Sequence, residues 1–284
     1  MKTNNVYYGD CMNLSKKLSS NSIDLVVTSP PYADIRSYGK DVNLFHPDNY
    51  VDWILPLYKE AARFLKSSGS FVIVINDKVI DGCRHPYVFD MVCRVINETG
   101  LKLYDRYVWI KKGGLPTGTG DRFNDWMEYI FHFVKDPKEF KRDTKQVRYK
   151  YTDEEIISGG YSYDLEVKTK VVDSDGILQR RKKPRKFIPI NPDGKKPMTW
   201  MRFNRACMLK TSKYDHPAPF TEEIPEFFIR WLTEKGDLVM DPFLGSGTTA
   251  YVAKLMEREY IGFELNSTYK DFIDERLDWA TLPL

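Results

Sequence analysis

Residues 238–249 have the sequence LVMDPFLGSGTT: an apolar run, a turn with two glycines, and two threonines. The apolar run predicts a buried strand, and the threonines with the residues after them predict a helix. Glycine at 245 and 247 would let the backbone approach a ligand where a side chain would collide. A G-x-G turn can also be a plain tight turn, so its surroundings decide what it binds.

Two neighbouring features favour a nucleoside as that ligand. Glu264 ends the next predicted strand, 23 residues after Asp241, where a carboxylate can accept hydrogen bonds from ribose hydroxyls. The third glycine of the dinucleotide pattern is missing, because Ala250 and Tyr251 follow the threonines. A pyrophosphate loop is therefore less favoured, and a Walker A loop is excluded because no Gly-Lys-Ser/Thr follows.

The position of this unit indicates a circular permutation. Only 35 of the 284 residues follow it, enough for one strand and one or two helices. The remaining strands of a nucleoside-binding sheet must then come from the N-terminal half. The cofactor-binding start of the sheet would lie late in the sequence.

The rest of the chain alternates between the periodicities of strands and helices, which predicts an α/β domain with a mostly parallel sheet. Asp48 is expected to cap a helix in which Pro56 makes a kink or marks a later start. Strands are expected at residues 23–28, 71–75, 103–110, 126–134 and 260–263, and helices at 87–97, 224–232, 248–256 and from the last strand to Trp279.

The alternation stops over residues 135–214, where glycines and prolines predict a loop-rich insert with short strands near 167–172 and 187–190. Residues 135–213 contain 21 Lys and Arg against 11 Asp and Glu, a net charge of +10, whereas the remainder carries −7. This division indicates that the insert faces a polyanion. A solvated basic loop is the alternative.

A stiff turn, Thr28-Ser29-Pro30-Pro31-Tyr32, follows the first of these strands. The two prolines fix φ and remove two N–H donors, so nearby carbonyls stay free to accept. Tyr32 is expected at the carboxyl end of a strand, where open α/β sheets bind ligands. Taken alone, the two prolines are explained more simply by a rigid surface turn.

The turn also fits a specific reaction at the exocyclic amino group of a base. That nitrogen is a poor nucleophile because its lone pair is delocalised into the ring. The Ser29 hydroxyl and the Pro30 carbonyl could accept its two hydrogens and direct the lone pair at a sulfonium methyl. Tyr32 could stack on the flipped base. No covalent nucleophile is needed.

Together, the Ser-Pro-Pro-Tyr turn and Asp-Pro-Phe-Leu-Gly-Ser-Gly-Thr-Thr, in this order, resemble the DNA amino-methyltransferases of cytosine N4 and adenine N6. The resemblance is to their permuted group, in which the catalytic motif comes first. It implies a Rossmann-like, S-adenosylmethionine-dependent methyltransferase sheet with helices on both faces, circularly permuted, plus the loop-rich basic insert. Residues 1–134 would form the catalytic part, 135–214 the target recognition insert, and 215–284 the cofactor-binding part.

The resemblance also assigns roles to residues. Ser29, Pro30, Pro31 and Tyr32 would be catalytic, and Ser29 in place of aspartate favours cytosine N4 over adenine N6. Tyr8-Gly9-Asp10-Cys11 looks like the adenine-contacting motif, residues 109–111 look like a later sheet motif, and the segment from His216 looks like the one that closes over the methionine end. S-adenosylmethionine would contact Asp10, Thr28, Asp241, Phe243, Gly245, Ser246, Gly247, Thr248, Glu264 and His216.

The expected partner is double-stranded DNA. A basic run in the insert suits contacts with phosphates better than base reading; it consists of Arg180, Arg181, Lys182, Lys183, Arg185 and Lys186. A cognate restriction endonuclease acting separately is compatible with this, and the oligomeric state stays open. No apolar stretch predicts a membrane span, and we expect a cytoplasmic protein whose four cysteines are free thiols. Cys83 and His85 lack a second pair for zinc, so no metal is expected.

Three other classes of protein fit the sequence less well. Methylation at carbon 5 of cytosine needs a cysteine, usually after proline, and no Pro-Cys occurs here. Glutamine methyltransferases carry Asn-Pro-Pro-Tyr after the glycine turn, whereas here the proline turn precedes it. A non-catalytic DNA-binding module would explain the insert, but not the glycine turn, Glu264 or the stiff turn.

Overall fold

The computed structural model describes residues 1–33, 46–112, 122–150, 160–163, 169–172, 178–181, 186–189, 191–204 and 221–280. The chain divides into two compact units. The first consists of Met1–Asp143 and Met198–Leu284, and the second of Thr144–Pro197.

The first unit is built on one eight-stranded sheet. Its strands, in spatial order, are β1 (Asn5–Tyr8), β14 (Glu259–Glu264), β13 (Leu238–Asp241), β2 (Ile23–Thr28), β3 (Leu65–Ile75), β7 (Met127–Val134), β6 (Lys102–Lys112) and β12 (Trp200–Asn204). Neighbouring strands are parallel except β7, which is antiparallel to both β3 and β6. Strands from the two ends of the chain alternate at one side of the sheet, since β14 and β13 lie between β1 and β2. The circular permutation is thus confirmed.

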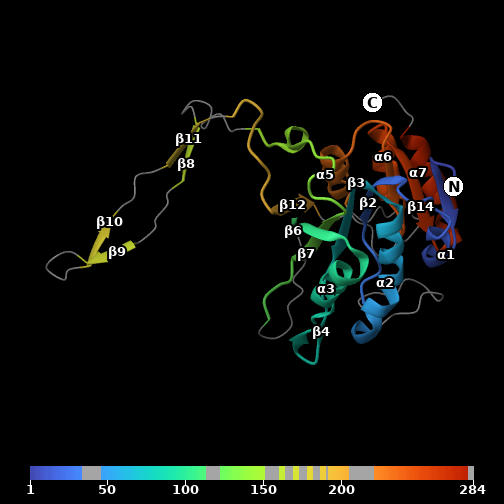
Figure 1. The fold of residues 1–284 in the computed structure, drawn as a ribbon, viewed down its shortest axis with the longest axis horizontal. Coiled ribbons are helices and arrows are strands. Elements are labelled where there is room, and N and C mark those ends of the chain that lie inside the picture. The colour runs from blue at the N-terminus through green and yellow to red at the C-terminus, as the bar shows by residue number, and fades with distance from the viewer. Residues whose placement is uncertain are drawn as a thin grey trace. The chain divides into compact units, whose positions relative to one another are not determined.

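Helices cover both faces of this sheet (Figure 1). Of the helices α1 (Cys11–Ser15), α2 (Pro47–Phe64) and α3 (Tyr87–Thr99), α2 contacts both others. On the opposite face, α6 (Thr248–Leu255) contacts both α5 (Glu223–Leu232) and α7 (Lys270–Trp279). The central strands are buried on both sides for this reason, and all six residues of β2 are buried. Such strands appear in the sequence as continuous apolar runs.

The helix α2 differs from the prediction at its start. It begins at Pro47, and the N-cap is His46, whose Nδ1 accepts a hydrogen bond from the Asp48 N–H. The expectation that Asp48 is the cap was wrong, as was that of a start after Pro56, because the helix runs through Pro56 to Phe64. Proline at the first helical turn costs no hydrogen bond, which favours the earlier start.

Several short elements of the first unit were not predicted. They include β1 and α1, the hairpin of β4 (Val79–Ile80) and β5 (Cys83–Arg84), and η2 (Ser267–Tyr269). The strand β12 was assigned to the insert, but it pairs in parallel with β6 at the edge of the main sheet. Among the helices that the structure describes, none combines the length and apolar character needed to cross a membrane.

The described residues of the second unit form η1 (Thr144–Val147) and two short antiparallel pairs of strands. One pair joins β8 (Gly160–Tyr163) to β11 (Lys186–Pro189), and the other joins β9 (Thr169–Val172) to β10 (Leu178–Arg181). The strands expected near 167–172 and 187–190 correspond to β9 and β11. The second unit lies within the insert predicted over 135–214, and residues 135–143 and 198–204 are part of the first unit.

Candidate active site

Three of the residues predicted to bind the cofactor lie where parallel strands of the main sheet end. The strands β14, β13 and β2 end at Glu264, Asp241 and Thr28, and these strands are neighbours in the sheet. Because β7 is antiparallel, it begins at this same edge, where Ile75 at the end of β3 pairs with Tyr129. Ligands of open α/β sheets bind at this edge.

Glu264 is held by backbone hydrogen bonds next to the glycine turn. Its Oε2 accepts from the Gly245 N–H at 2.7 Å, and its Oε1 accepts from the Asn266 N–H at 2.8 Å. Burial raises the pKa of this carboxyl, and the backbone hydrogen bonds oppose the rise. An ionised carboxylate has about four acceptor positions, so Glu264 can still accept hydrogen bonds from ribose hydroxyls.

The glycine turn has the backbone conformation that glycine favours. Gly245 has φ of 56° and Gly247 has φ of 82°, both in the left-handed region. A Cβ at Gly247 would also lie 3.3 Å from Ile273 Cγ2 on α7. Glycine at 247 therefore suits both the conformation of the turn and the close packing of α7. The sequence did not reveal the packing of α7 against this position.

Asp241 ties the glycine turn to the Ser-Pro-Pro-Tyr turn. Its Oδ1 accepts from the Thr28 hydroxyl at 2.7 Å and from the Phe243 N–H at 3.0 Å. Its Oδ2 accepts from the Thr249 hydroxyl at 2.7 Å. Burial raises the pKa of Asp241 to about 6, although these hydrogen bonds act in the opposite direction. The residue before Ser29 is thus bonded directly to the first residue of the glycine turn.

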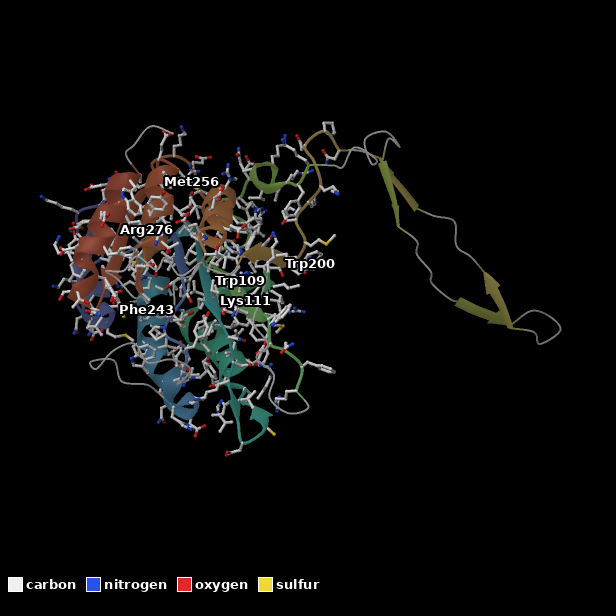
Figure 2. All side chains as sticks on the ribbon, turned by 180° about the vertical axis from the view of Figure 1, so that it is seen from behind. Trp109, Lys111, Trp200, Phe243, Met256 and Arg276 are labelled. Atoms are coloured by element: carbon white, nitrogen blue, oxygen red, sulfur yellow. The ribbon has the colours of Figure 1, made fainter. Side chains whose placement is uncertain are left out.

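Arg276, labelled in Figure 2, lies on α7 and is hydrogen-bonded to the glycine turn. Its guanidinium donates to the Ser246 carbonyl and the Thr248 hydroxyl, both at 3.1 Å, and to Glu222 at 2.6 Å. The Ser246 and Thr248 side chains are buried beside it. Nothing in the sequence indicated this role, because an arginine in a charged C-terminal helix looks like a surface residue.

Asp10 and Phe243 occupy the margins of the site. Asp10 is exposed and is the N-cap of α1, with its Oδ1 accepting from the Met12 N–H at 2.8 Å. The Phe243 ring, labelled in Figure 2, is partly buried, and its centroid lies 6.1 Å from that of Trp53 on α2. Trp53 was not predicted to belong to the site.

The Ser-Pro-Pro-Tyr turn leaves β2 with Pro30 buried and Ser29 and Tyr32 half-buried. The Tyr32 ring packs against the hydrophobic core. Its hydroxyl donates to Glu128 Oε2 at 2.5 Å, and the Ser29 hydroxyl donates to Tyr32 Oη at 3.3 Å. The two side chains predicted to act on the base are therefore joined to each other and to a carboxylate.

The carboxylate of Glu128 lies on β7, which is paired with β6. Glu128, near the start of β7, lies opposite Trp109 on β6, and Lys111 shares the face of Trp109 because alternate residues of a strand point the same way. Lys111 Nζ lies 2.5 Å from Glu128 Oε1 and 5.4 Å from the centroid of the Trp109 ring (Figure 2). The signal that could have revealed Glu128 was a lone carboxylate in the apolar sequence of β7.

A second ion cluster lies beyond the end of β3. Asp77 is buried and pairs with Arg84 of β5, which also contacts Asp125 at 2.9 Å. Burial raises the pKa of Asp77, and its contacts with Arg84 oppose the rise. These contacts fasten the β4–β5 hairpin beside the candidate site.

Some predicted residues lie outside the described part of the structure: His216, Lys182, Lys183 and Arg185. Arg180 and Arg181 lie on β10 and Lys186 on β11. Cys11, Cys83 and Cys93 are free thiols, and Cys207 is not described. Within the described residues, no group of three or more His, Cys, Asp or Glu could hold a metal ion.

Comparisons with known proteins agree with this geometry. Residues 23–275 match a family model described as DNA methylase. The chain is 30% identical to the type II methyltransferase M.PvuII of Proteus hauseri, over 93% of this chain and 80% of the relative. It is 27% identical to the DNA adenine methyltransferase YhdJ of Escherichia coli K12, over 97% of this chain and 83% of the relative.

Solved structures share the fold. The PvuII DNA methyltransferase (cytosine-N4-specific) superimposes with a TM-score of 0.70 and 26% identity, covering 100% of this chain and 88% of that one. TTHA0409 of Thermus thermophilus, complexed with S-adenosyl-L-methionine, superimposes with a TM-score of 0.59 and 21% identity, covering 98% and 96%. The predicted α/β methyltransferase fold is confirmed.

Proposed function

Because this chain belongs to the DNA methylase family and is a DNA amino-methyltransferase of the N4/N6 class, we propose that it methylates the 4-amino group of cytosine in duplex DNA. The observation that carries the proposal is the junction of two turns. Thr28, which precedes the Ser-Pro-Pro-Tyr turn, is hydrogen-bonded to Asp241, which begins the glycine turn. A base held by the first turn would meet a cofactor held by the second.

The methyl donor that fits the glycine turn is S-adenosylmethionine, whose sulfonium supplies an electrophilic methyl group. Glu264 has acceptor positions left for two ribose hydroxyls, and it fixes Gly245 in the turn. We assign the adenine end to Asp10 and the methionine end to the segment that contains His216. The complex of TTHA0409 with S-adenosyl-L-methionine supports the choice of donor.

The catalytic turn would act by position rather than by covalent chemistry. The flipped base stacks on Tyr32, and its amino hydrogens are accepted by the Ser29 hydroxyl and the Pro30 carbonyl. The nitrogen lone pair is then directed at the methyl group for an in-line transfer. A nitrogen–carbon bond forms as the sulfur–carbon bond breaks, and the sulfur keeps the bonding electrons. The extra proton of the amino group leaves to solvent or to a nearby acceptor after the transfer.

Cytosine is favoured over adenine by two observations. Ser29 stands where the adenine-specific members of the family mostly carry aspartate, and the PvuII methyltransferase, which superimposes with a TM-score of 0.70, is cytosine-N4-specific. Adenine N6 is the second candidate, because YhdJ is an adenine methyltransferase with 27% identity. Ser29 itself presents a neutral acceptor that would suit either amino group.

The experiment that decides between the bases is direct. DNA methylated by the purified protein is digested to nucleosides, which are separated and identified by mass spectrometry. We expect 4-methyldeoxycytidine. N6-methyldeoxyadenosine without 4-methyldeoxycytidine would overturn the cytosine assignment in favour of adenine, and unmodified DNA would overturn the proposed reaction.

The insert over residues 135–214 is proposed to recognise the target sequence. The net charge of +10 over residues 135–213 supports contact with DNA. Within it, residues 180–186 would bind phosphates and so orient the protein on the duplex without reading bases.

A further inference from the structure

A chain of four interacting side chains ends in the catalytic turn: Lys111, Glu128, Tyr32 and Ser29. Glu128 receives the Tyr32 hydroxyl on Oε2 and the Lys111 ammonium on Oε1, both at 2.5 Å. Tyr32 in turn receives the Ser29 hydroxyl at 3.3 Å. Glu128 is only 7% exposed, so water competes little for these contacts.

We propose that Glu128 is a positioning residue that orients the Ser29 hydroxyl as a hydrogen-bond acceptor for the base, an inference that rests on the proposed function. The base contacts Ser29 and Tyr32 but need not touch Glu128. The role of Glu128 is to set which way the hydrogens of the two hydroxyls point.

The direction of each hydrogen bond follows from which groups can donate a hydrogen and which can only accept one. An ammonium can only donate, and a carboxylate can only accept. Lys111 fixes one carboxylate oxygen of Glu128, and the single hydrogen of the Tyr32 hydroxyl is directed at the other. Tyr32 Oη then presents only lone pairs to Ser29, so the Ser29 hydrogen points at Tyr32.

The Ser29 oxygen therefore keeps its lone pairs for the site. An amino group that must lose its planarity needs acceptors at both hydrogens, and a serine hydroxyl with a free rotor could present its own hydrogen instead. The chain to Glu128 removes that competing orientation before the base arrives. Preorganisation of this kind stabilises a transition state because no group must reorient during reaction.

The Glu128→Gln substitution tests the direction of the hydrogen bonds between Glu128, Tyr32 and Ser29. Lys111 would draw the amide oxygen toward itself, which turns the amide NH₂ toward Tyr32. The Tyr32 hydroxyl would then accept from the amide and donate to Ser29. The Ser29 hydrogen would point into the site and oppose the amino hydrogens of the base. Tyr32→Phe, in contrast, only cuts the chain and keeps the aromatic ring.

The test is a double-mutant cycle in single-turnover methyl transfer from labelled S-adenosylmethionine to DNA. We expect Glu128→Gln to slow transfer about tenfold to hundredfold and Tyr32→Phe to slow it less. The double variant should transfer at the rate of Tyr32→Phe alone, faster than Glu128→Gln, because the inverted chain no longer reaches Ser29. The dissociation constant for S-adenosylmethionine should stay within about twofold in all three.

Glu226→Gln is the matched control, because Glu226 is a carboxylate in an exposed ion pair with Arg230 on α5. Its transfer rate should equal that of the parent. Reductions in rate that multiply in the double variant, or a Glu128→Gln variant as fast as the parent, would overturn the positioning role. A parent protein that transfers no methyl group would instead overturn the proposed function, so the two failures are distinguishable.

Discussion

At the scale of single residues, Asp241 shows how burial and hydrogen bonding oppose each other. Thr28, Thr249 and the Phe243 N–H all donate to its carboxylate, which favours the charged form. Burial disfavours that form more strongly and raises the pKa of Asp241 to about 6. The junction of the two turns therefore depends on a carboxyl group that titrates close to neutral pH.

This shift predicts a pH-dependent difference in stability between the parent and Asp241→Asn. An unfolded aspartate titrates near about 3.9, so between that pH and about 6 the folded state keeps a proton that the unfolded state has released. The group's contribution to stability is full below about pH 4 and decreases as the pH rises to about 6. Relative to the non-titrating Asn variant, the parent should lose up to about 3 kcal/mol of unfolding free energy.

Urea denaturation of both proteins at intervals between about pH 4 and about pH 7 measures this difference. Groups common to both proteins cancel in the comparison. A difference that is constant across the range would show that the carboxyl of Asp241 titrates alike in the folded and unfolded states.

At the scale of elements, the sequence predicted the strands and turns that have a strong local sequence signal. It did not predict the contacts that residues make with other elements. The continuous apolar run of β2 identified a strand covered on both faces, and the glycines identified the turn before α6. The edge strand β12 has an alternating, half-exposed sequence beside prolines, and only its pairing with β6 defines it. Glu128 and Arg276 were missed for the same reason, because their roles arise from partners on other elements.

Arg276 carries a prediction at this scale, since it links α7 to the glycine turn. Its guanidinium is buried, makes charge-assisted hydrogen bonds to Ser246 and Thr248, and lies 5.1 Å from the centroid of the Tyr251 ring. Replacing Arg276 with Met should lower the free energy of unfolding by about 2–3 kcal/mol and weaken binding of S-adenosylmethionine.

Glu222→Gln is the matched control, because it weakens only the ion pair of Arg276 with a side chain that is 51% exposed. The amide oxygen of glutamine can still accept a hydrogen bond from the guanidinium, and the side chain at 222 is 51% exposed, so this variant should stay close to the parent in urea denaturation. Equal decreases in the two variants would mean that the ion pair, and not the interaction with the turn, is what Arg276 contributes.

At the scale of the whole molecule, charge is divided between the two parts of the chain. Residues 135–213 carry +10 while the remainder carries −7, so DNA should be attracted to the insert and not to the acidic remainder. Replacing Lys182, Lys183 and Arg185 with Ala should weaken binding to duplex DNA of any sequence. The slope of log K against log salt should fall by roughly 0.9 for each phosphate that the variant no longer neutralises. Fluorescence anisotropy on a labelled duplex between about 50 and 200 mM salt measures the slope.

Replacing Lys16, Lys17 and Lys59, which are exposed on the first unit, removes the same charge and should leave the slope unchanged. If both triple variants flatten the slope equally, net charge alone governs binding and the basic run makes no phosphate interaction of its own.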